Sequence, residues 1–386
     1  MIHPVLPFIL LSIVIILLLL EIVLVKRSRE RILIRILVNG TRGKSSVVEY
    51  IAAGLRAGGI PTFAKITGVI PTIFLPDGQN KALRRRGPAR VQEQVNMLQK
   101  ASKLQVNAVV MENMSLKPEY QRLESNVLKP TIYVITNILD DHREEMGATD
   151  EERVRLICSA IPLGSNVVTI DTQHRQIIED EAKKRESALI VVTPEQDNIE
   201  NLPSGVFSEN LLLARTVCKL AGMEGEQVWN GMLNYARTNA ETSQLMVPVQ
   251  KGFRFINGFA VNDFLSAEKF LSYYRQGFPQ EQKLILVLNT RADRPLRTVQ
   301  FARWCATRTD LSKIILIGTH RSVAKRILLS GGCLSEKVEI WNKNAIRNCV
   351  QHWQGSGATV IGIGNIAGDG FLMLNTLNES VTKEKF

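Results

Sequence analysis

The chain has 386 residues, and the part beyond its apolar N-terminus, about 360 residues, is longer than one hydrophobic core usually serves, so we expect two domains. A net charge of +11 could attract nucleic acid, but no groove-reading motif accompanies it, and we expect no nucleic-acid partner. The five cysteines lack metal-ligand spacing, which excludes a cysteine metal site and favours reduced thiols in the cytoplasm.

Residues 1–30 are predicted to form a membrane anchor and a basic juxtamembrane segment. Only Pro7, Ser12 and Glu21 interrupt the apolar run from Val5 to Val25, and a helix of that length crosses a hydrocarbon core. A cleaved signal peptide and a buried core helix are the alternatives, but basic residues follow the run and no small-residue cleavage site appears. These residues are Lys26, Arg27, Arg29 and Arg31. The positive-inside rule therefore predicts a single-pass cell-membrane protein, in contact with membrane lipid, whose remaining domains face the cytoplasm.

A phosphate-binding loop is predicted directly after the apolar run from Ile32 to Val38. Its residues are Gly40, Thr41, Arg42, Gly43, Lys44, Ser45 and Ser46. The glycines let backbone N–H groups turn toward phosphate, the lysine can reach the β- and γ-phosphates, and the next hydroxyl suits Mg²⁺. Val38 stands where the general pattern has its first glycine, and a chance Gly-Lys-Ser turn on a surface loop is the alternative. A helix from Ser45 to Ala57 would point its positive end at the same anion.

The following segments alternate in a way that predicts a parallel sheet wrapped by helices. Apolar runs lie at 108–111, 131–136, 166–170 and 188–192, and an amphipathic segment lies at 91–104. We place the domain boundary in the polar segment 237–244, which gives a first domain at 31–244. The second, at 245–386, is predicted to be a smaller, doubly wound α/β domain. Its predicted strands are 253–261, 283–288, 313–317 and 358–363.

Two polar segments follow predicted strands of the first domain, at the edge where open α/β sheets bind ligands. Thr136 to His142 ends one strand, and Met111 to Asn113 ends another. Such residues are often ordinary caps. Beside a phosphate loop, however, they could supply carboxylate and imidazole ligands for Mg²⁺.

Taken together, these motifs resemble the Mur ligase superfamily of ATP-dependent amide ligases. The order is G-T-x-G-K-S, the strand-end Glu112, T-N-x-x-x-D-H-x-x-x-x-G from Thr136 to Gly147, and the helix that begins Ser208 to Ala214. The resemblance implies an N-terminal transmembrane helix followed by a P-loop, Mur-ligase-like central domain with a mostly parallel sheet. A smaller Rossmann-like C-terminal α/β domain completes the expected fold.

The likeness is closer still to the poly-γ-glutamate synthase subunits called PgsB or CapB, and it extends over essentially the whole chain. The matching segments are the N-terminal membrane helix, 76–78, 85–87 with 93–94, 257–263, 289–295 and 362–365. Two features of wider Mur ligases are missing. No lysine lies between Thr149 and Pro162, where many carry a carbamylated lysine that helps to hold Mg²⁺, and there is no N-terminal precursor-binding domain.

The resemblance implies roles for the candidate residues. Lys44 would bind the β- and γ-phosphates, Ser45 and Glu112 would hold Mg²⁺, and His142 would lie near a second Mg²⁺ or the acyl phosphate. Asn137 would approach the adenine. In the second domain, Arg291 would contact phosphate and Asp293 the ribose. A surface ion pair or turn cap is the alternative for these last two residues.

The expected activity is therefore ATP-dependent, γ-linked polymerisation of glutamate through an acyl phosphate. The alternatives are a ligase acting on another carboxylate, such as a folate or wall precursor, and a membrane-associated P-loop ATPase that energises a transporter. Expected partners are glutamate, the poly-γ-glutamate chain and small integral-membrane subunits, and self-association into a homo-oligomer is left open. The basic cluster Arg84 to Arg86 could attract an anionic polymer or simply form a solvated face. The turn Gly362 to Ala367 mimics a dinucleotide fingerprint, which we discount because no acidic residue follows in a further strand.

Overall fold

A computed structural model describes residues 6–68, 71–85, 87, 89–139, 143–147, 149–193, 202, 206–243, 252–261, 264–276 and 283–382. The chain divides into two compact units, unit 1 from Met1 to Arg237 and unit 2 from Thr238 to Phe386, and each is described by itself. The boundary predicted at residue 244 falls outside the described residues and stays a prediction. The predicted α/β architecture with mostly parallel sheets is confirmed in both units.

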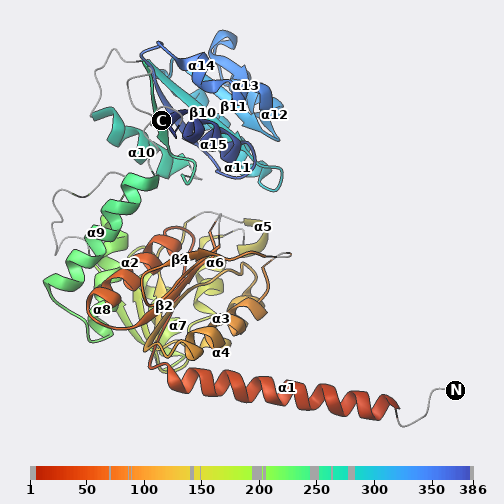
Figure 1. The fold of residues 1–386 in the computed structure, drawn as a ribbon, viewed down its shortest axis with the longest axis vertical. Helices are drawn as coiled ribbons and strands as arrows, with labels where there is room; N and C mark the ends of the chain where they lie inside the picture. The colour runs from red at the N-terminus through yellow and green to blue at the C-terminus, as the bar shows by residue number, and fades with distance from the viewer. Residues whose placement is uncertain are drawn as a thin grey trace. The chain divides into compact units, whose positions relative to one another are not determined.

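The N-terminal helix α1 (Leu6–Arg31) projects from unit 1 (Figure 1). Its window of highest hydropathy averages 3.3 and has no buried residue, so by length and composition α1 could cross a membrane. The C-terminal end of α1 is docked on the unit, where Ser28 is buried and Val25 packs against the core. The predicted apolar helix is therefore present.

Unit 1 is built on a sheet whose described strands follow the order β4-β3-β2-β5-β1-β6-β7-β8. The pairs β2–β3 and β3–β4 are antiparallel and the others are parallel. The strands are β1 (Ile34–Asn39), β2 (Thr62–Ile66), β3 (Thr72–Phe74), β4 (Asn80–Ala82), β5 (Ala108–Glu112), β6 (Ile132–Ile135), β7 (Asn166–Thr169) and β8 (Ala188–Val191). The four predicted runs from 108 onward form β5 to β8, whereas β2, β3 and β4 were not predicted.

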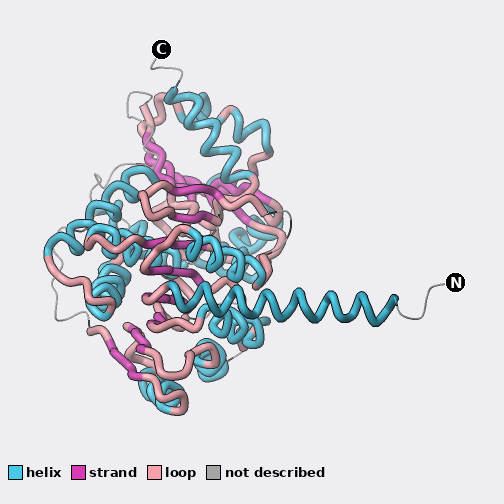
Figure 2. The backbone as a smooth tube through the Cα atoms, turned by 60° about the horizontal axis from the view of Figure 1, so that its bottom comes forward, coloured by secondary structure: helices cyan, strands magenta, loops and turns pink. Residues whose placement is uncertain are grey.

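Helices cover both faces of this sheet, so the strands lie between helical layers (Figure 2). One core layer joins Val38 and Val110 of the sheet to Ile51 and Leu213 of the helices. The other joins Leu37 to apolar side chains of the helices on the opposite face. The helices are α2 (Lys44–Ala57), α3 (Gln92–Lys103), α4 (Pro118–Leu128), α5 (Arg143–Met146), α6 (Asp150–Cys158), α7 (Arg175–Lys183), α8 (Ser208–Leu220) and α9 (Glu226–Ser243). Because successive residues of a strand face opposite sides, Leu37 and Val38 enter different layers.

Unit 2 has a parallel sheet whose described strands follow the order β12-β11-β10-β13-β9. They are β9 (Arg254–Asn257), β10 (Leu284–Thr290), β11 (Lys313–Gly318), β12 (Val338–Ile340) and β13 (Thr359–Ile363). Its helices are α10 (Phe264–Gln276), α11 (Pro295–Ala306), α12 (Arg321–Ser330), α13 (Lys343–Arg347), α14 (Cys349–Trp353) and α15 (Asp369–Thr382), with a 3₁₀ turn η3 (Ser335–Lys337). Core layers on both faces confirm the predicted doubly wound domain, and Trp341 stacks on Trp353 in one of them.

Candidate nucleotide and metal site

The phosphate loop lies between the end of β1 and the start of α2, where two glycines adopt left-handed backbone angles. Gly40 has φ 125° and Gly43 has φ 79°. A Cβ atom on Gly40 would collide with Thr136 Oγ1, and one on Gly43 would lie 2.6 Å from Asn210 Oδ1. Only glycine fits both positions without strain, so the loop can bring its N–H groups to the N-terminus of α2.

Lys44 is folded over the same loop. Its Nζ donates hydrogen bonds to the carbonyl oxygens of Gly40, at 2.7 Å, and Thr41, at 3.3 Å. The ammonium group therefore stays beside the loop, within reach of an anion that the loop amides bind.

The structure brings together Ser45 and Glu112, two of the predicted metal ligands. Ser45 Oγ donates to Glu112 Oε2 at 2.9 Å, and the backbone N–H of Thr67 donates to the same oxygen at 2.7 Å. Glu112 ends β5, the strand beside β1, which is why residues 67 positions apart meet. A hydroxyl and a carboxylate are oxygen ligands of the kind that Mg²⁺ and similar hard divalent cations take. This donor set fits such a metal.

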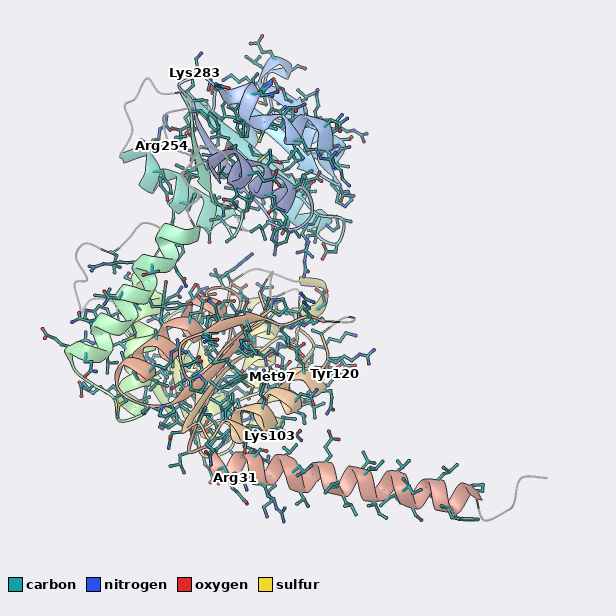
Figure 3. The ribbon with its side chains drawn as sticks, viewed as in Figure 1. Arg31, Met97, Lys103, Tyr120, Arg254 and Lys283 are labelled. Carbon is teal, nitrogen blue, oxygen red and sulfur yellow. The ribbon has the colours of Figure 1, made fainter. Side chains whose placement is uncertain are left out.

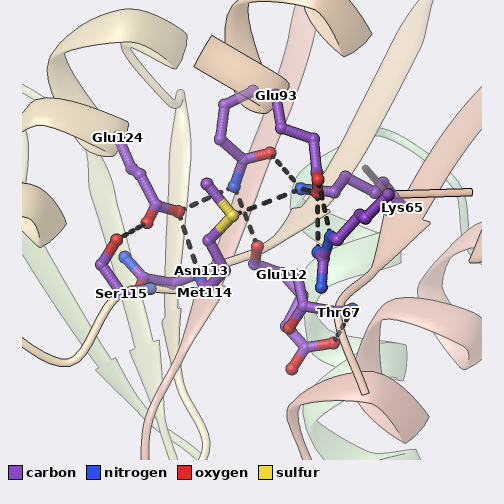
Figure 4. Close-up of polar contacts among 10 residues, drawn as sticks. Lys65, Thr67, Glu93, Glu112, Asn113, Met114, Ser115 and Glu124 are labelled. Carbon is purple, nitrogen blue, oxygen red and sulfur yellow. Dashed lines mark hydrogen bonds and ion pairs between the residues drawn. The ribbon is translucent and has the colours of Figure 1, made fainter. Parts of the chain in front are cut away.

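Gln94, on the first turn of α3, supports the backbone of Glu112. Figure 4 shows Glu112 among the polar contacts of Lys65, Glu93 and Glu124. Its Nε2 donates to the Glu112 carbonyl at 3.0 Å and to Glu124 Oε2 at 2.7 Å. Its Oε1 accepts from Lys65 Nζ at 3.0 Å. Burial raises the pKa of Glu124, despite hydrogen bonds from Ser115 and Gln94. Because both the nitrogen and the oxygen of the Gln94 amide are hydrogen-bonded, we expect Gln94 to fix the end of β5.

Lys65 and Glu93 form an ion pair behind this support, in which Lys65 is buried and Glu93 is partly buried. Lys65 Nζ lies 2.6 Å from Glu93 Oε1, and Lys65 has no exposed surface. Arg85 binds the same carboxylate through two hydrogen bonds of 2.7 and 2.8 Å. Burial lowers the pKa of Lys65; burial alone would raise that of Glu93, but hydrogen bonds from Arg85 and Lys65 lower it. We call Lys65, Arg85, Glu93, Gln94 and Glu124 the α3 network.

Asn137 holds the phosphate loop from the neighbouring strand β6. Its Oδ1 accepts from Thr41 Oγ1 at 2.7 Å and from the Arg42 N–H at 2.9 Å, and its Nδ2 donates to the Arg42 carbonyl at 3.2 Å. Both ends of the amide are thus engaged by the loop. The contact with adenine that we predicted for Asn137 stays a prediction.

Asp171, which the sequence reasoning missed, holds the segment that follows Asn137. Its Oδ2 accepts from the Ile138 N–H at 3.0 Å, and its Oδ1 accepts from the His174 N–H at 3.0 Å. The His174 ring Nδ1 lies 3.0 Å from both carboxylate oxygens. The available signal was a carboxylate just beyond the apolar run that forms β7.

His142 lies outside the described residues, so its predicted part in metal binding and catalysis stays a prediction. Within the described part of the chain, no group of three or more histidine, cysteine, aspartate or glutamate residues is arranged to hold a metal. A cation on Ser45 and Glu112 would therefore take further ligands from phosphate oxygens, from water or from His142.

In unit 2, Arg291 and Asp293 follow β10 and pair with each other. Two hydrogen bonds of 2.7 and 2.6 Å join the guanidinium to the carboxylate. Burial acts to raise the pKa of Asp293, but the hydrogen bond from Arg291 outweighs it and the pKa is lowered. The ion pair that we considered as an alternative is therefore present, and the predicted contacts with phosphate and ribose stay predictions.

A pocket opens at the carboxyl edge of the unit 2 sheet, between the loops after β10 and β13. It is lined by Leu288, Asn289, Thr290, Arg291, Arg294, Arg297, Thr298, Phe301, Gly364 and Asn365. Asn289 Oδ1 and Asn365 Nδ2 are buried there, and neither atom has a hydrogen-bond partner among the described residues. A basic lining with an unpaired donor suits an acidic ligand. Both asparagines lie within the segments that match the poly-γ-glutamate synthase subunits, but the sequence indicated no role for them.

Family models match two consecutive parts of the chain. Residues 38–216 match the Mur ligase middle domain, and residues 242–380 match the poly-gamma-glutamate synthase CapB C-terminal domain. The first match contains the phosphate loop and Glu112, and the second contains the arginine-lined pocket.

Curated relatives align over nearly the full length. The chain is 28% identical to the PGA synthase CapB of Bacillus subtilis (strain 168) over 372 residues, which cover 93% of this chain and 94% of that protein. It is 27% identical to the capsule biosynthesis protein CapB of Bacillus anthracis over 362 residues, which cover 91% of this chain and 78% of that protein.

Solved structures with the same fold include folylpolyglutamate synthases. E. coli FolC in complex with ADP has a TM-score of 0.69 and 16% identity, with 94% of each chain covered. The Mycobacterium tuberculosis folylpolyglutamate synthase complexed with ADP has a TM-score of 0.69 and 12% identity, covering 92% of this chain and 93% of that chain. The Yersinia pestis bifunctional enzyme complexed with AMPPNP and Mn ion has a TM-score of 0.64 and 16% identity, covering 94% and 93%.

Proposed function

The chain belongs to the CapB family of poly-γ-glutamate synthases, and on that premise we infer that it is an ATP-dependent amide ligase that lengthens poly-γ-glutamate. The predicted resemblance is confirmed. The match of the C-terminal domain to CapB favours this activity over a folate or wall-precursor ligase. The observation that carries the inference is a phosphate loop with a paired Ser45 and Glu112, followed in the same chain by a CapB C-terminal domain.

ATP and a divalent metal are the cofactors of this ligase, and we propose that the metal is Mg²⁺. ADP is bound in one solved structure of E. coli FolC, and AMPPNP with manganese is bound in one of the Yersinia pestis bifunctional enzyme. In this chain, Ser45 and Glu112 would hold the cation, which would supply charge neutralisation on the phosphates. Lys44 and the loop N–H groups would bind the phosphates themselves.

The reaction needs no nucleophile from the protein. An oxygen of the acceptor's terminal γ-carboxylate attacks the γ-phosphorus of ATP, and ADP leaves. The amine of the incoming glutamate then attacks the acyl carbon, phosphate leaves, and the nitrogen gives up a proton as the amide forms. Lys44 and the loop amides would stabilise charge on the transferred phosphoryl group. For His142, Asn137, Arg291 and Asp293 we retain the roles that the family resemblance implies.

We further propose that α1 spans the cell membrane once and that both units face the cytoplasm. The cations Lys26 and Arg27 follow the apolar part of α1, which supports this orientation under the positive-inside rule. One helix cannot form an export pore, so small integral-membrane subunits are expected partners. Self-association into a homo-oligomer is left open.

Product analysis tests the proposal. Membranes that contain the full chain, supplied with ATP, Mg²⁺ and glutamate, should form γ-linked polymer, ADP and phosphate, with ¹⁸O from the carboxylate appearing in the phosphate. Lys44→Ala should lower turnover about 10²–10³-fold while the protein remains folded. Lys219→Ala, at an exposed lysine of α8, is the matched control. AMP as the product would exclude the acyl phosphate route, and phosphate release that is independent of glutamate would favour the transporter ATPase.

A further inference from the structure

Helix α1 changes its surroundings near Glu21. Before that residue, the large apolar side chains from Phe8 to Leu20 are 47–70% exposed. After it, Val25 packs against the core of unit 1 and Ser28 is buried. Ile22, Val23 and Leu24 are still exposed, and the exposed cations Lys26 and Arg27 follow. The surface of a bilayer around α1 therefore falls between Glu21 and Lys26, about 8 Å along the helix.

The docked half of α1 runs beside α3 in the same direction. At one end, Gln92 Nε2 donates to Glu21 Oε1 at 2.6 Å. At the other end, Ile32 packs in one cluster with Leu98 and Ala101 of α3. Figure 3 labels Arg31 and Lys103 at this same end of the two helices. The first turn of α3 is thus level with the point where α1 enters the membrane.

The first turn of α3 also carries Gln94, which supports the candidate metal ligand Glu112. Gln92 contacts the anchor, and Gln94, two residues on, donates to the Glu112 carbonyl at 3.0 Å. Glu112 in turn binds Ser45 of the phosphate loop. A helix with its side chains is about 10–12 Å wide, so the site lies roughly one helix width from the anchor. The carboxyl edge of the sheet is therefore on the membrane side of unit 1.

Exposed cations precede this turn in the chain. Lys81 on β4, Arg84 and Arg90 are exposed, whereas Arg85 is committed to Glu93. Gln92 follows Arg90 by two residues, so the segment reaches the level of Glu21. Lysine and arginine at that level attract anionic headgroups.

We propose that the carboxyl edge of the unit 1 sheet faces the membrane, with Lys81, Arg84 and Arg90 on the phosphates of anionic lipid headgroups. The proposal rests on α1 being the membrane anchor. It means that the acceptor chain is lengthened at the bilayer surface and that export can begin without diffusion through the cytoplasm.

The test places a nitroxide label at residue 84 or 90 of the full-length protein. The background is Cys333→Ser, because the other four cysteines are buried. Arg84→Cys and Arg90→Cys are compared with Lys103→Cys at the far end of α3, in bilayers of phosphatidylcholine with and without phosphatidylglycerol. A nickel-chelating lipid reports proximity to the headgroups. We expect relaxation of the labels at 84 and 90 to exceed that at 103 about tenfold, since these sites lie a helix length apart.

A charge-reversal pair tests the lipid contact. Arg84→Glu with Arg90→Glu should remove the increase in proximity that anionic lipid causes, measured at Lys81→Cys. Lys100→Glu with Lys103→Glu makes the same change in net charge at the far end of α3 and should leave that increase in place.

Each outcome has a distinct reading. Equal relaxation at 84, 90 and 103 in a protein that floats with the vesicles overturns the orientation but leaves the anchor standing. If relaxation of the labels does not depend on anionic lipid and is unchanged by the charge-reversal pair, binding to headgroup phosphates is overturned. A protein that does not float with vesicles overturns the anchor itself, while polymer formation in the product assay tests the ligase separately.

Discussion

The two sheet edges of this protein differ in how their polar groups are satisfied. At the unit 1 edge, Glu112 and Asn137 are held by hydrogen bonds from their own unit before any ligand binds. At the unit 2 edge, Asn289 Oδ1 and Asn365 Nδ2 are buried without a hydrogen-bond partner in the part of the chain that the structure describes. A buried polar group without a partner destabilises the fold, so it is retained where a ligand completes it. The comparison suggests a preorganised phosphate site in one unit and a ligand-completed site in the other.

The largest expected effect tests the preorganisation of unit 1. Lys65→Met should lower the free energy of unfolding of unit 1 by about 2–3 kcal/mol, because it removes one of the two cations that bind the partly buried Glu93. Urea denaturation followed by hydrogen exchange in β2 and β5 measures this change. Lys65→Met combined with Glu93→Gln should recover part of the loss. A loss below about 1 kcal/mol in the single variant would show that the α3 network does not stabilise the edge.

The second prediction concerns how the stability of unit 1 depends on pH through the buried carboxyl group of Glu49. Glu49 lies one turn after Ser45 on α2. Burial, together with repulsion from Glu112, raises the pKa of Glu49 to about 8, and a hydrogen bond with Tyr235 opposes this rise only in part. The folded state therefore keeps a proton that the unfolded state loses near pH 4.5. Stability should fall as pH rises between these values, by at most about 1.4 kcal/mol per pH unit.

Glu49→Gln isolates this contribution. The variant should match the native protein at low pH, where Glu49 is protonated in both states, and should become the more stable of the two as pH rises toward 8. Urea unfolding at pH 5, 6.5 and 8 measures the difference. Parallel pH profiles for the two proteins would mean that Glu49 does not carry the shift.

Sequence patterns were sufficient to predict the strands that are continuous apolar runs and the sheet edge at which polar residues meet. Apolar runs predicted β5 to β8, and the rule that ligands bind at carboxyl ends of parallel strands predicted that Ser45 and Glu112 would meet. Strand β2 was not predicted because Lys65 interrupts its apolar run. A buried lysine needs a partner, and that partner, Glu93, lies on another element. The three-residue strands β3 and β4 are too short to show periodicity.

The candidate site was harder to predict where strand order mattered. Asn137 reaches the phosphate loop because β6 pairs with β1, and Asp171 reaches Ile138 because β7 pairs with β6. Neither pairing can be read from local residues. The family resemblance supplied residue roles but not these contacts, which exist only once the strands are ordered.

The smallest expected effect tests the unit 2 edge, where the unpaired Asn365 Nδ2 should donate to an acidic ligand. Asn365→Asp keeps the oxygen that accepts from the Ala367 N–H at 2.8 Å and replaces the unpaired donor with an acceptor. Stability without ligand should fall, because the new carboxylate is buried and nothing in the described chain bonds to its second oxygen. Affinity should fall about tenfold, or 1.4 kcal/mol, because a charge-assisted hydrogen bond is lost. Asn344→Asp, an exposed change of equal charge on α13, is the control. The affinity is measured from the thermal shift as glutamate or an ATP analogue is added. Glutamate tests a carboxylate ligand and the ATP analogue a phosphate ligand, and the variant should lose affinity only for the one that binds in this pocket. Unchanged affinity for both ligands would mean that the pocket holds neither, and that the two edges differ in packing and not in ligand binding.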